Sequence, residues 1–259
     1  MAGTGVYNGK ILEHRHLNDY YSLLTIEVPE IAMYAKPGQF VMVACREQGS
    51  LDPLLRRPLS LHNILADDGQ IQLLYQLRGK GTSWLWQRRP GETLSLLGPL
   101  GRGFRLPPEV NKAVLVGGGI GNAPLLPIAQ VLAQFELESR FFTGARSEAH
   151  LVGVEPIAAL GIPVHISTED GSVGRQGLVT EELAVYLERE RPDYLYACGP
   201  LPMLKAVVKL ARQYGLAGQV SLEETMACGI GICLGCDCGG KKVCKEGPVF
   251  AIEEVVLND

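Results

Sequence analysis

Residues 112–135 read KAVLVGGGIGNAPLLPIAQVLAQF, and this stretch decides how the second half of the chain folds. The apolar run after its first residue is typical of a buried strand, and the run after the turn has the length of a helix. Glycines in the turn let a backbone approach a pyrophosphate, while the following helix N-terminus offers N–H groups. The candidate nucleotide-binding residues here are Gly117, Gly118, Gly119 and Gly121. The alternative is a tight turn whose glycines serve packing alone.

Strands and helices continue to alternate up to about residue 222. Further strands are expected at 139–145, 163–170, 193–200 and from Gly218, with helices around 154–160, 180–187 and 203–214. This alternation predicts a doubly wound parallel sheet, which binds ligands at the carboxyl ends of its strands. Cys198, Gly199 and Pro200 follow one such strand, although Cys198 could equally be a buried strand residue. Asp170 follows another strand, where a carboxylate could bond an adenosine ribose and favour NAD over NADP.

The first hundred residues have the pattern of a β domain. Short apolar stretches recur between turn signals, which predicts an antiparallel barrel or sandwich. Arg56-Arg57 precedes one strand, and a single planar guanidinium group can bond two pyrophosphate oxygens at once. The run 79–82, GKGT, begins a predicted short helix and offers N–H groups and a hydroxyl. Taken singly, an arginine pair is usually a solvated patch and GKGT is usually a plain turn. The expected strands are 11–17, 21–28, 39–45, 58–64, 70–77 and 92–100.

Residues 228–244 read CGIGICLGCDCGGKKVC. The spacing C-x4-C-x2-C of Cys228, Cys233 and Cys236 is that of plant-type [2Fe–2S] proteins, in which a later cysteine completes the set. Cys244 is the preferred fourth ligand because Cys238 would crowd a ligand already placed at Cys236. Structural zinc is the alternative, but it usually takes two C-x2-C pairs. Disulfides are disfavoured because no export signal is expected in the opening residues.

Composition and charge set limits on the function. The chain has 259 residues, of which 46% are hydrophobic and 20% charged, and this is ordinary globular usage. Its net charge of −4 gives no indication of a nucleic-acid partner. The uncharged stretch 113–135 is long enough to span a membrane, but its glycines, prolines and polar residues favour a strand, a turn and a buried helix. We expect a cytoplasmic protein that spans no membrane.

The order of the motifs RRPLS, GKGT, GGGIG and CGP resembles the ferredoxin–NADP reductase superfamily, in which a flavin-binding barrel precedes a nicotinamide-binding domain. The C-terminal sequence CGIGICLGC…VCKEGPVF narrows the resemblance to electron-transfer subunits of class 1B dihydroorotate dehydrogenases. The resemblance covers essentially the whole chain and is most specific over residues 223–250. The segment between Cys236 and Cys244 is short for this family and contains Cys238, so the fourth ligand is less certain than the other three.

The resemblance implies three regions and their cofactors. These are an FAD-binding β-barrel domain at 1–103, an NAD-binding α/β domain at 109–222 and a [2Fe–2S] lobe at 223–259. Arg57 is expected near the FAD pyrophosphate and Ser60 near the isoalloxazine. The implied FAD residues are Arg57, Pro58, Leu59, Ser60, Leu74, Tyr75, Gln76, Gly81 and Thr82, and the implied cluster ligands are Cys228, Cys233, Cys236 and Cys244.

The resemblance also implies a function that needs a partner. Electrons would pass from the flavin of an FMN-containing dihydroorotate dehydrogenase catalytic subunit to the [2Fe–2S] cluster, then to FAD and NAD+. The complex would be a heterotetramer with two copies of each subunit. No residue of this chain is expected to act as a catalytic acid or base. The alternatives are a reductase subunit of the sulfide dehydrogenase or NADH-dependent ferredoxin:NADP oxidoreductase type, and a zinc-stabilised adaptor without activity.

Overall fold

The computed structural model describes residues 3–47, 49–255 and 257, and the chain divides into two compact units. The first unit contains the chain up to Gly103 together with Glu224–Pro248, and the second contains Phe104–Glu223 together with the chain from Val249 onward. The C-terminal segment that was expected as a lobe of its own therefore contributes to both units. The assignment of three cofactor-binding regions with the boundaries given above stays a prediction.

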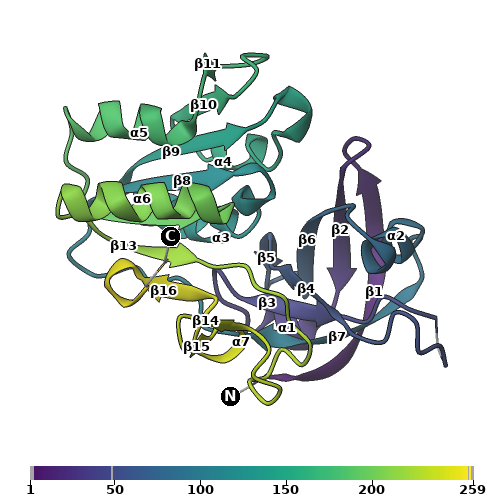
Figure 1. Ribbon diagram of the computed structural model, residues 1–259. Helices are drawn as coiled ribbons and strands as arrows, with labels where there is room; N and C mark the ends of the chain where they lie inside the picture. Colours follow the sequence, from purple (N-terminus) through teal and green to yellow (C-terminus); the bar gives the residue numbers. More distant parts are fainter. Residues whose placement is uncertain (1–2, 48, 256, 258–259) are drawn as a thin grey trace. The chain divides into compact units, whose positions relative to one another are not determined.

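The first unit is built on an antiparallel sheet of seven strands in the order β4-β3-β7-β1-β2-β6-β5 (Figure 1). Strands β4 and β6 also approach each other although they are not hydrogen-bonded neighbours, so the sheet curls into a barrel-like form. The predicted antiparallel barrel is confirmed. The elements are β1 (Gly5–His16), β2 (Tyr21–Glu27), α1 (Pro29–Ala32), β3 (Phe40–Val43), β4 (Arg57–Ser60), β5 (Asn63–Leu65), β6 (Gln70–Gln76), α2 (Lys80–Trp86) and β7 (Thr93–Leu100).

The barrel closes around a core of aliphatic side chains from the central strands. Ile11 of β1, Leu24 and Ile26 of β2 and Leu73 of β6 are fully buried there. The single strand expected at 58–64 is in fact two strands, β4 and β5. These two lie at opposite ends of the strand order, because β4 pairs with β3 and β5 pairs with β6. The chain must therefore cross from one end of the sheet to the other between them.

The cysteine-rich segment of the first unit holds β14 (Asp237–Cys238), β15 (Lys241–Lys242) and α7 (Val243–Glu246). It contacts the barrel at two places. A Cβ on Gly229 would lie 2.5 Å from Met42 Cγ of β3, so the loop backbone lies directly against that strand. Beyond β7, the backbone N–H of Arg102 donates to Gly247 O at 2.5 Å. These contacts make the segment part of the barrel unit although it is distant in sequence.

The second unit contains a seven-stranded sheet in the order β11-β10-β9-β8-β12-β13-β16. Its strands pair in parallel except for β16, which adds antiparallel to β13 at one edge. Helices α3 and α4 contact each other, as do α5 and α6, and the two pairs lie on opposite faces of the sheet (Figure 1). The predicted doubly wound sheet is confirmed, whereas β11 and β16 were not expected.

The bounds of these elements are β8 (Lys112–Gly118), η1 (Gly119–Asn122), α3 (Leu125–Gln134), β9 (Glu138–Ala145), η2 (Glu148–His150), α4 (Glu155–Ala158), β10 (Val164–Thr168), β11 (Arg175–Gln176), α5 (Val179–Leu187), β12 (Tyr194–Cys198), α6 (Leu201–Gln213), β13 (Ala217–Ser221), β16 (Val249–Ala251) and η3 (Ile252–Glu254). The uncharged stretch 113–135 is thus divided among β8, η1 and α3. Across the described ranges, no helix combines the length and apolar character needed to cross a membrane.

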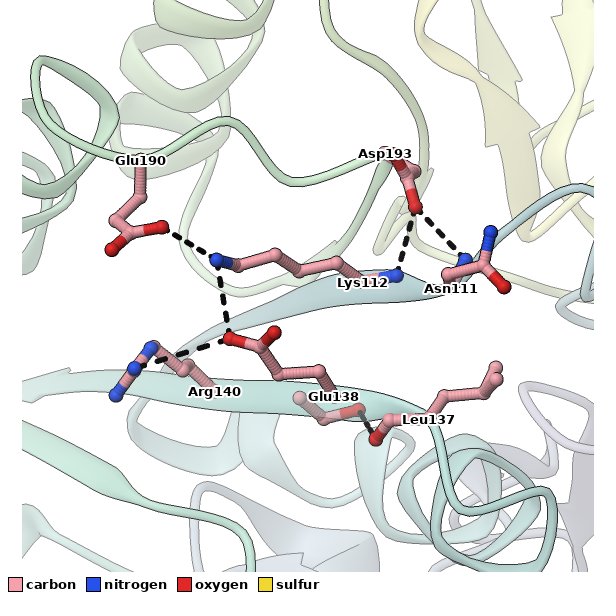
Figure 2. Close-up of polar contacts among 8 residues, drawn as sticks. Asn111, Lys112, Leu137, Glu138, Arg140, Glu190 and Asp193 are labelled. Atoms are coloured by element: carbon pink, nitrogen blue, oxygen red, sulfur yellow. Dashed lines mark hydrogen bonds and ion pairs between the residues drawn. The ribbon is translucent and has the colours of Figure 1, made fainter.

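Charged residues hold the amino-terminal edge of this sheet together (Figure 2). Lys112 Nζ at the start of β8 donates to Glu190 Oε2 at 2.6 Å and to Glu138 Oε1 of β9 at 3.1 Å. These bonds raise the pKa of Lys112. Asp193, just before β12, accepts the backbone N–H groups of Asn111 and Lys112 at 2.9 and 2.8 Å. This edge lies opposite the carboxyl ends of the strands, where the candidate nucleotide residues are found.

Candidate functional site

The two glycine-containing turns of the second unit meet at the carboxyl edge of adjacent strands. Gly117 at the end of β8 is the register partner of Cys198 at the end of β12. A Cβ on Gly121 would lie 2.5 Å from Cys198 O and 2.6 Å from Gly199 Cα, so only a glycine permits this approach. Strands β9 and β10 lie on one side of β8, and β12 and β13 lie on the other. This is a switch point of the strand order, the usual ligand position in such sheets.

Gly119 differs from the other glycines of the turn because it faces open space. Its φ of +54° is in the left-handed region that favours glycine. Apart from its chain neighbours, the one described atom within 4 Å of its Cβ position is His150 O at 3.9 Å. By contrast, a Cβ on Gly118 would meet Met203 Sδ at 2.7 Å. Gly119 is therefore the glycine of this turn that a ligand could approach.

The remaining predicted nucleotide residues lie at the same edge. The Cys198 side chain is buried, and burial raises the pKa of its thiol. Its backbone faces the turn, because Cys198 O lies 2.5 Å from the Cβ position of Gly121. Gly199 and Pro200 lead into α6. Asp170 follows β10, and its Oδ1 accepts the Ser172 hydroxyl at 2.6 Å and the Ser172 N–H at 2.9 Å. These bonds lower the pKa of Asp170, so its carboxylate is ionised and held in place.

In the first unit, the structure brings the RRPLS and GKGT motifs into contact. A Cβ on Gly81 would lie 2.8 Å from Arg57 Nε, so the Arg57 side chain lies directly on the start of α2. The neighbouring Arg56 is engaged elsewhere, since Nη1 donates to Ser95 O at 2.7 Å and Nη2 donates to Ser95 Oγ at 2.9 Å. Arg56 therefore ties β4 to β7, and Arg57 is the arginine that lies beside the predicted phosphate loop.

The Thr82 hydroxyl organises the loop in which it lies. It accepts the backbone N–H groups of Arg78 and Gly79 at 2.9 and 3.0 Å and donates to Gly79 O at 3.0 Å. This closes the turn before α2 and sets the direction of the N–H groups at the start of that helix. The contribution of Thr82 to a phosphate site is thus the shape of the loop.

The three predicted FAD residues of β6 face different surroundings. Leu74 and Tyr75 are buried, and Gln76 is half-buried. Tyr75 OH lies 3.0 Å from His14 Nε2, and His14 Nδ1 lies 2.7 Å from Arg88 O. Because a carbonyl only accepts, Nδ1 carries the proton and the tyrosine hydroxyl donates to Nε2. The Tyr75 side chain is therefore engaged within the barrel. Pro58, Leu59 and Ser60 lie in β4 after Arg57, and all three are half-buried.

The cysteine-rich loop directs backbone N–H groups at sulfur atoms. Cys228 Sγ accepts from Ile230 N and Cys233 N, each at 3.5 Å. Cys244 Sγ accepts from Gly231 N at 3.1 Å, and Cys236 Sγ accepts from Cys244 N at 3.4 Å. Hydrogen bonds to sulfur stabilise thiolates and tune the potential of iron–sulfur clusters. The donor set therefore fits a [2Fe–2S] cluster.

The thiols of this loop differ in acidity. Burial opposes ionisation of Cys228, but the N–H groups of Cys233 and Ile230 outweigh it and lower the pKa of Cys228 to about 6. Burial and the neighbouring Cys236 thiol raise the pKa of Cys244 to about 12. A buried thiol of this kind ionises when a metal cation compensates its charge. In the described part of the chain, no three His, Cys, Asp or Glu side chains converge as ligands of one metal ion, so the assignment of the four cysteines to one cluster stays a prediction.

Cys238 lies in a different setting from Cys244. It is in β14 of a two-stranded hairpin, where it pairs with Lys241 of β15. Burial and the nearby Glu224 and Asp237 carboxylates raise the pKa of Cys238. Cys244, in contrast, is connected to the cluster loop through Gly231 N. This difference supports Cys244 as the fourth ligand.

Sequence reasoning missed the buried polar residues that support the glycine turn through hydrogen bonds. Asn122 and Thr143, for example, are fully buried beneath the glycine turn and bond each other. The polar residue Asn122 directly after GGGIG was the available signal. Among the apolar side chains of residues 226–234, Met226 is buried, whereas Ile230, Ile232 and Leu234 are exposed, Ile232 by 75%.

Comparison with known proteins places these features in one family. The sequence pattern of the iron–sulfur cluster binding domain of dihydroorotate dehydrogenase B matches residues 223–256. The dihydroorotate dehydrogenase B (NAD(+)) electron transfer subunit of Bacillus caldolyticus is 43% identical over 244 residues, which cover 90% of this chain and 92% of that protein. The subunit of the same name from Desulforamulus reducens is 39% identical and covers 92% of this chain and 93% of that protein.

Solved structures agree with the fold. The structure of an NADH-dependent reduced ferredoxin-NADP oxidoreductase superimposes with a TM-score of 0.82 at 31% identity, covering 99% of this chain and 92% of that chain. A ferredoxin NADP+ reductase from Neisseria gonorrhoeae with bound FAD and NADP shares the fold, with a TM-score of 0.68 at 21% identity, covering 81% and 92% of the two chains. Because the chain is 39% and 43% identical to these two relatives over 92% and 90% of its length, it belongs to the family of dihydroorotate dehydrogenase B (NAD(+)) electron transfer subunits.

Proposed function

We propose that this protein carries electrons from a dihydroorotate-oxidising subunit to NAD+, so that the complex converts dihydroorotate and NAD+ into orotate, NADH and a proton. The observation that carries the proposal is a cysteine loop with N–H groups aimed at sulfur, in a chain that matches these subunits over 90% of its length. A bound FAD would exchange single electrons with a [2Fe–2S] cluster and a hydride with a nicotinamide.

The residues of this chain bind and position these groups. Arg57 would hold the FAD pyrophosphate beside Gly81, where its side chain already lies. The turn around Gly119 would take the NAD pyrophosphate, and Asp170 its adenosine ribose. The four sulfur ligands would be Cys228, Cys233, Cys236 and Cys244. No side chain is assigned a proton-transfer role in the step.

The proposed partner is the FMN-containing dihydroorotate dehydrogenase catalytic subunit, in an assembly of two copies of each. Ile230, Ile232 and Leu234 expose aliphatic side chains from the loop that carries the cluster ligands. An interface there would bury them and bring a second redox centre toward the cluster. None of the seven cysteines forms a disulfide, which supports a site of action in the reducing cytoplasm.

The test is reconstitution of the complex. The chain is co-expressed with the catalytic subunit, and dihydroorotate-dependent reduction of NAD+ is measured at 340 nm with each subunit alone as the control. We expect NADH formation only in the complex. A complex with stoichiometric FAD, FMN, iron and sulfide that reduces no NAD+ would refute the assignment.

A second candidate is a reductase subunit of an NADH-dependent ferredoxin–NADP oxidoreductase. It is favoured by the superposition with that enzyme, which covers 99% of this chain. The same preparation separates the two functions, because the second candidate would work with ferredoxin and NADPH and would not respond to dihydroorotate. The higher identity to the dihydroorotate dehydrogenase subunits makes the first proposal the stronger one.

A further inference from the structure

A fully buried asparagine joins three segments beneath the nucleotide edge of the second unit. Asn122 Nδ2 donates to Thr143 Oγ1 of β9 and to Val152 O, both at 2.8 Å. The Thr143 hydroxyl donates back to Asn122 Oδ1 at 3.1 Å. Asn122, Thr143 and Val152 are all buried. A buried amide with three such bonds is rigid, because each lost bond leaves a polar group without water.

The joined segments border the space in front of Gly119. Asn122 is the last residue of η1, the short helix that begins at Gly119. Val152 follows η2, whose last residue His150 supplies the nearest atom to the Gly119 Cβ position, at 3.9 Å. The amide thus links the turn to the segment opposite it. Through its bond to Val152 O, Asn122 therefore connects the turn that carries Gly119 to the segment that carries His150.

The Asn122 amide also explains why residue 117, the first of the turn, must be a glycine. A Cβ on Gly117 would lie 1.9 Å from Asn122 Oδ1, far inside van der Waals contact. Gly117 is also the register partner of Thr143 across β8 and β9. The absent side chain at Gly117 is therefore what lets the Asn122 amide reach Thr143.

We propose that Asn122 is the positioning residue of the nucleotide-binding turn, with Thr143 as its anchor and Gly117 as the space it needs. It touches no ligand itself. It holds the N–H groups near Gly119 and the segment at His150 at the separation that a dinucleotide pyrophosphate requires. The inference rests on the proposed NAD function and adds a specific support for it.

The expected effect is on nucleotide affinity. Without the amide clamp, the turn and the segment at His150 move independently, and ordering them on binding costs free energy that weakens the affinity. We expect dissociation constants for NAD+ to rise by roughly tenfold. The maximal rate of Thr143→Val at saturating NADH should stay near the wild-type value, because Thr143 is buried beneath the turn and no candidate ligand-binding residue is changed.

The experiment uses the full chain loaded with FAD and cluster. Thr143→Val removes the hydroxyl at nearly constant shape, and Thr143→Ser keeps it. Gly117→Ala displaces the Asn122 amide from the other side, so that a failure of one variant to fold leaves a second test. NAD+ binding is measured by calorimetry, and the KM and kcat for NADH are measured with ferricyanide as acceptor.

A second buried amide in the same unit provides the control. Gln219 also makes three hydrogen bonds, with Arg105 N at 2.9 Å, Arg105 O at 3.0 Å and Tyr194 OH at 2.8 Å. Gln219→Met should lower the melting temperature without changing NAD+ affinity.

The outcomes separate the inference from the proposed function. Weaker NAD+ binding in Thr143→Val and Gly117→Ala, with affinity retained in Thr143→Ser and Gln219→Met, supports the positioning role. Wild-type affinity in Thr143→Val and Gly117→Ala, with only thermal stability lowered, overturns it. If the wild-type protein itself binds no NAD+, the proposed function of the site fails first and the inference fails with it.

Discussion

The contact between Gly229 and β3 gives a prediction that can be worked out in detail. Gly229 directly follows Cys228, a proposed cluster ligand, and has a φ of +73°. Its Cβ position lies 2.5 Å from Met42 Cγ and 3.1 Å from Met42 Sδ. Met42 is fully buried in β3, so it has little room to move aside. Gly229→Ala should therefore strain the backbone and push the cluster loop away from the barrel.

The magnitude follows from two separate costs. A left-handed backbone costs a residue with a side chain about 1–2 kcal/mol. Overpacking against a buried side chain adds about 1–3 kcal/mol. Their sum of about 2–5 kcal/mol corresponds to a fall in melting temperature of roughly 6–15 °C, at about 3 °C for each kcal/mol. Because the displaced residue adjoins Cys228, cluster occupancy should fall as well.

Two glycines of the same segment provide matched controls. Gly240 has a φ of +85°, and apart from its chain neighbours no described atom lies within 4 Å of its Cβ position, so Gly240→Ala tests the backbone cost alone. Among the described atoms beyond the neighbours of Gly235, Cys233 Sγ alone lies within 4 Å of its Cβ position, at 3.7 Å, so Gly235→Ala should be tolerated. The assay is calorimetric melting together with iron and acid-labile sulfide per FAD. Equal losses in Gly229→Ala and Gly240→Ala would show that the contact with Met42 has no weight.

Three further predictions concern acidity, charge and nucleotide choice. Burial lowers the pKa of His14 in the folded state, so below about pH 6.5 the unfolded chain binds a proton that the folded chain does not, and stability should fall. In urea titrations the His14→Gln variant should lack this fall. A pH dependence identical to that of the wild type would refute the role of His14. Lys112→Met removes the ion pairs to Glu138 and Glu190, so stability should fall slightly at low salt and less at high salt. Unfolding at both salt concentrations checks this, and a loss that does not depend on salt would contradict it. Asp170→Arg should raise the use of NADP relative to NAD in NAD(P)H oxidation assays, and an unchanged preference would contradict its assignment to the ribose.

The sequence predicted the elements that carry strong local signals. The strand, turn and helix of residues 112–135 were evident because a buried parallel strand is continuously apolar and its turn is rich in glycine. The strand β16 was not evident, because Val249–Ala251 is only three residues long and its pairing partner β13 ends 28 residues earlier. Such an edge strand is defined by its hydrogen bonds to a neighbour, which no local pattern records.

The motif RRPLS shows that a local sequence pattern also leaves the roles of single residues open. Arg56 and Arg57 are adjacent and chemically identical, so composition alone cannot distinguish them. Their roles separate only because one side chain points to Ser95 of β7 and the other to Gly81 of α2. The family resemblance singled out Arg57, and the three-dimensional arrangement adds that Arg56 secures the sheet while Arg57 lies at the candidate phosphate loop.

The glycine turn of the second unit extends this argument to the motif itself. GGGIG was interpreted as a single signal for a pyrophosphate, yet its glycines are required for different structural reasons. Gly121 is required by the backbone of Cys198, and Gly117 is required by the buried amide of Asn122. Only Gly119 combines a left-handed backbone with open space before it. The packing interpretation therefore holds for Gly117 and Gly121, whereas the ligand interpretation stays a prediction that now falls on Gly119. A glycine pattern of this kind is informative because a tightly packed turn is what holds one exposed backbone segment still enough to bind a nucleotide.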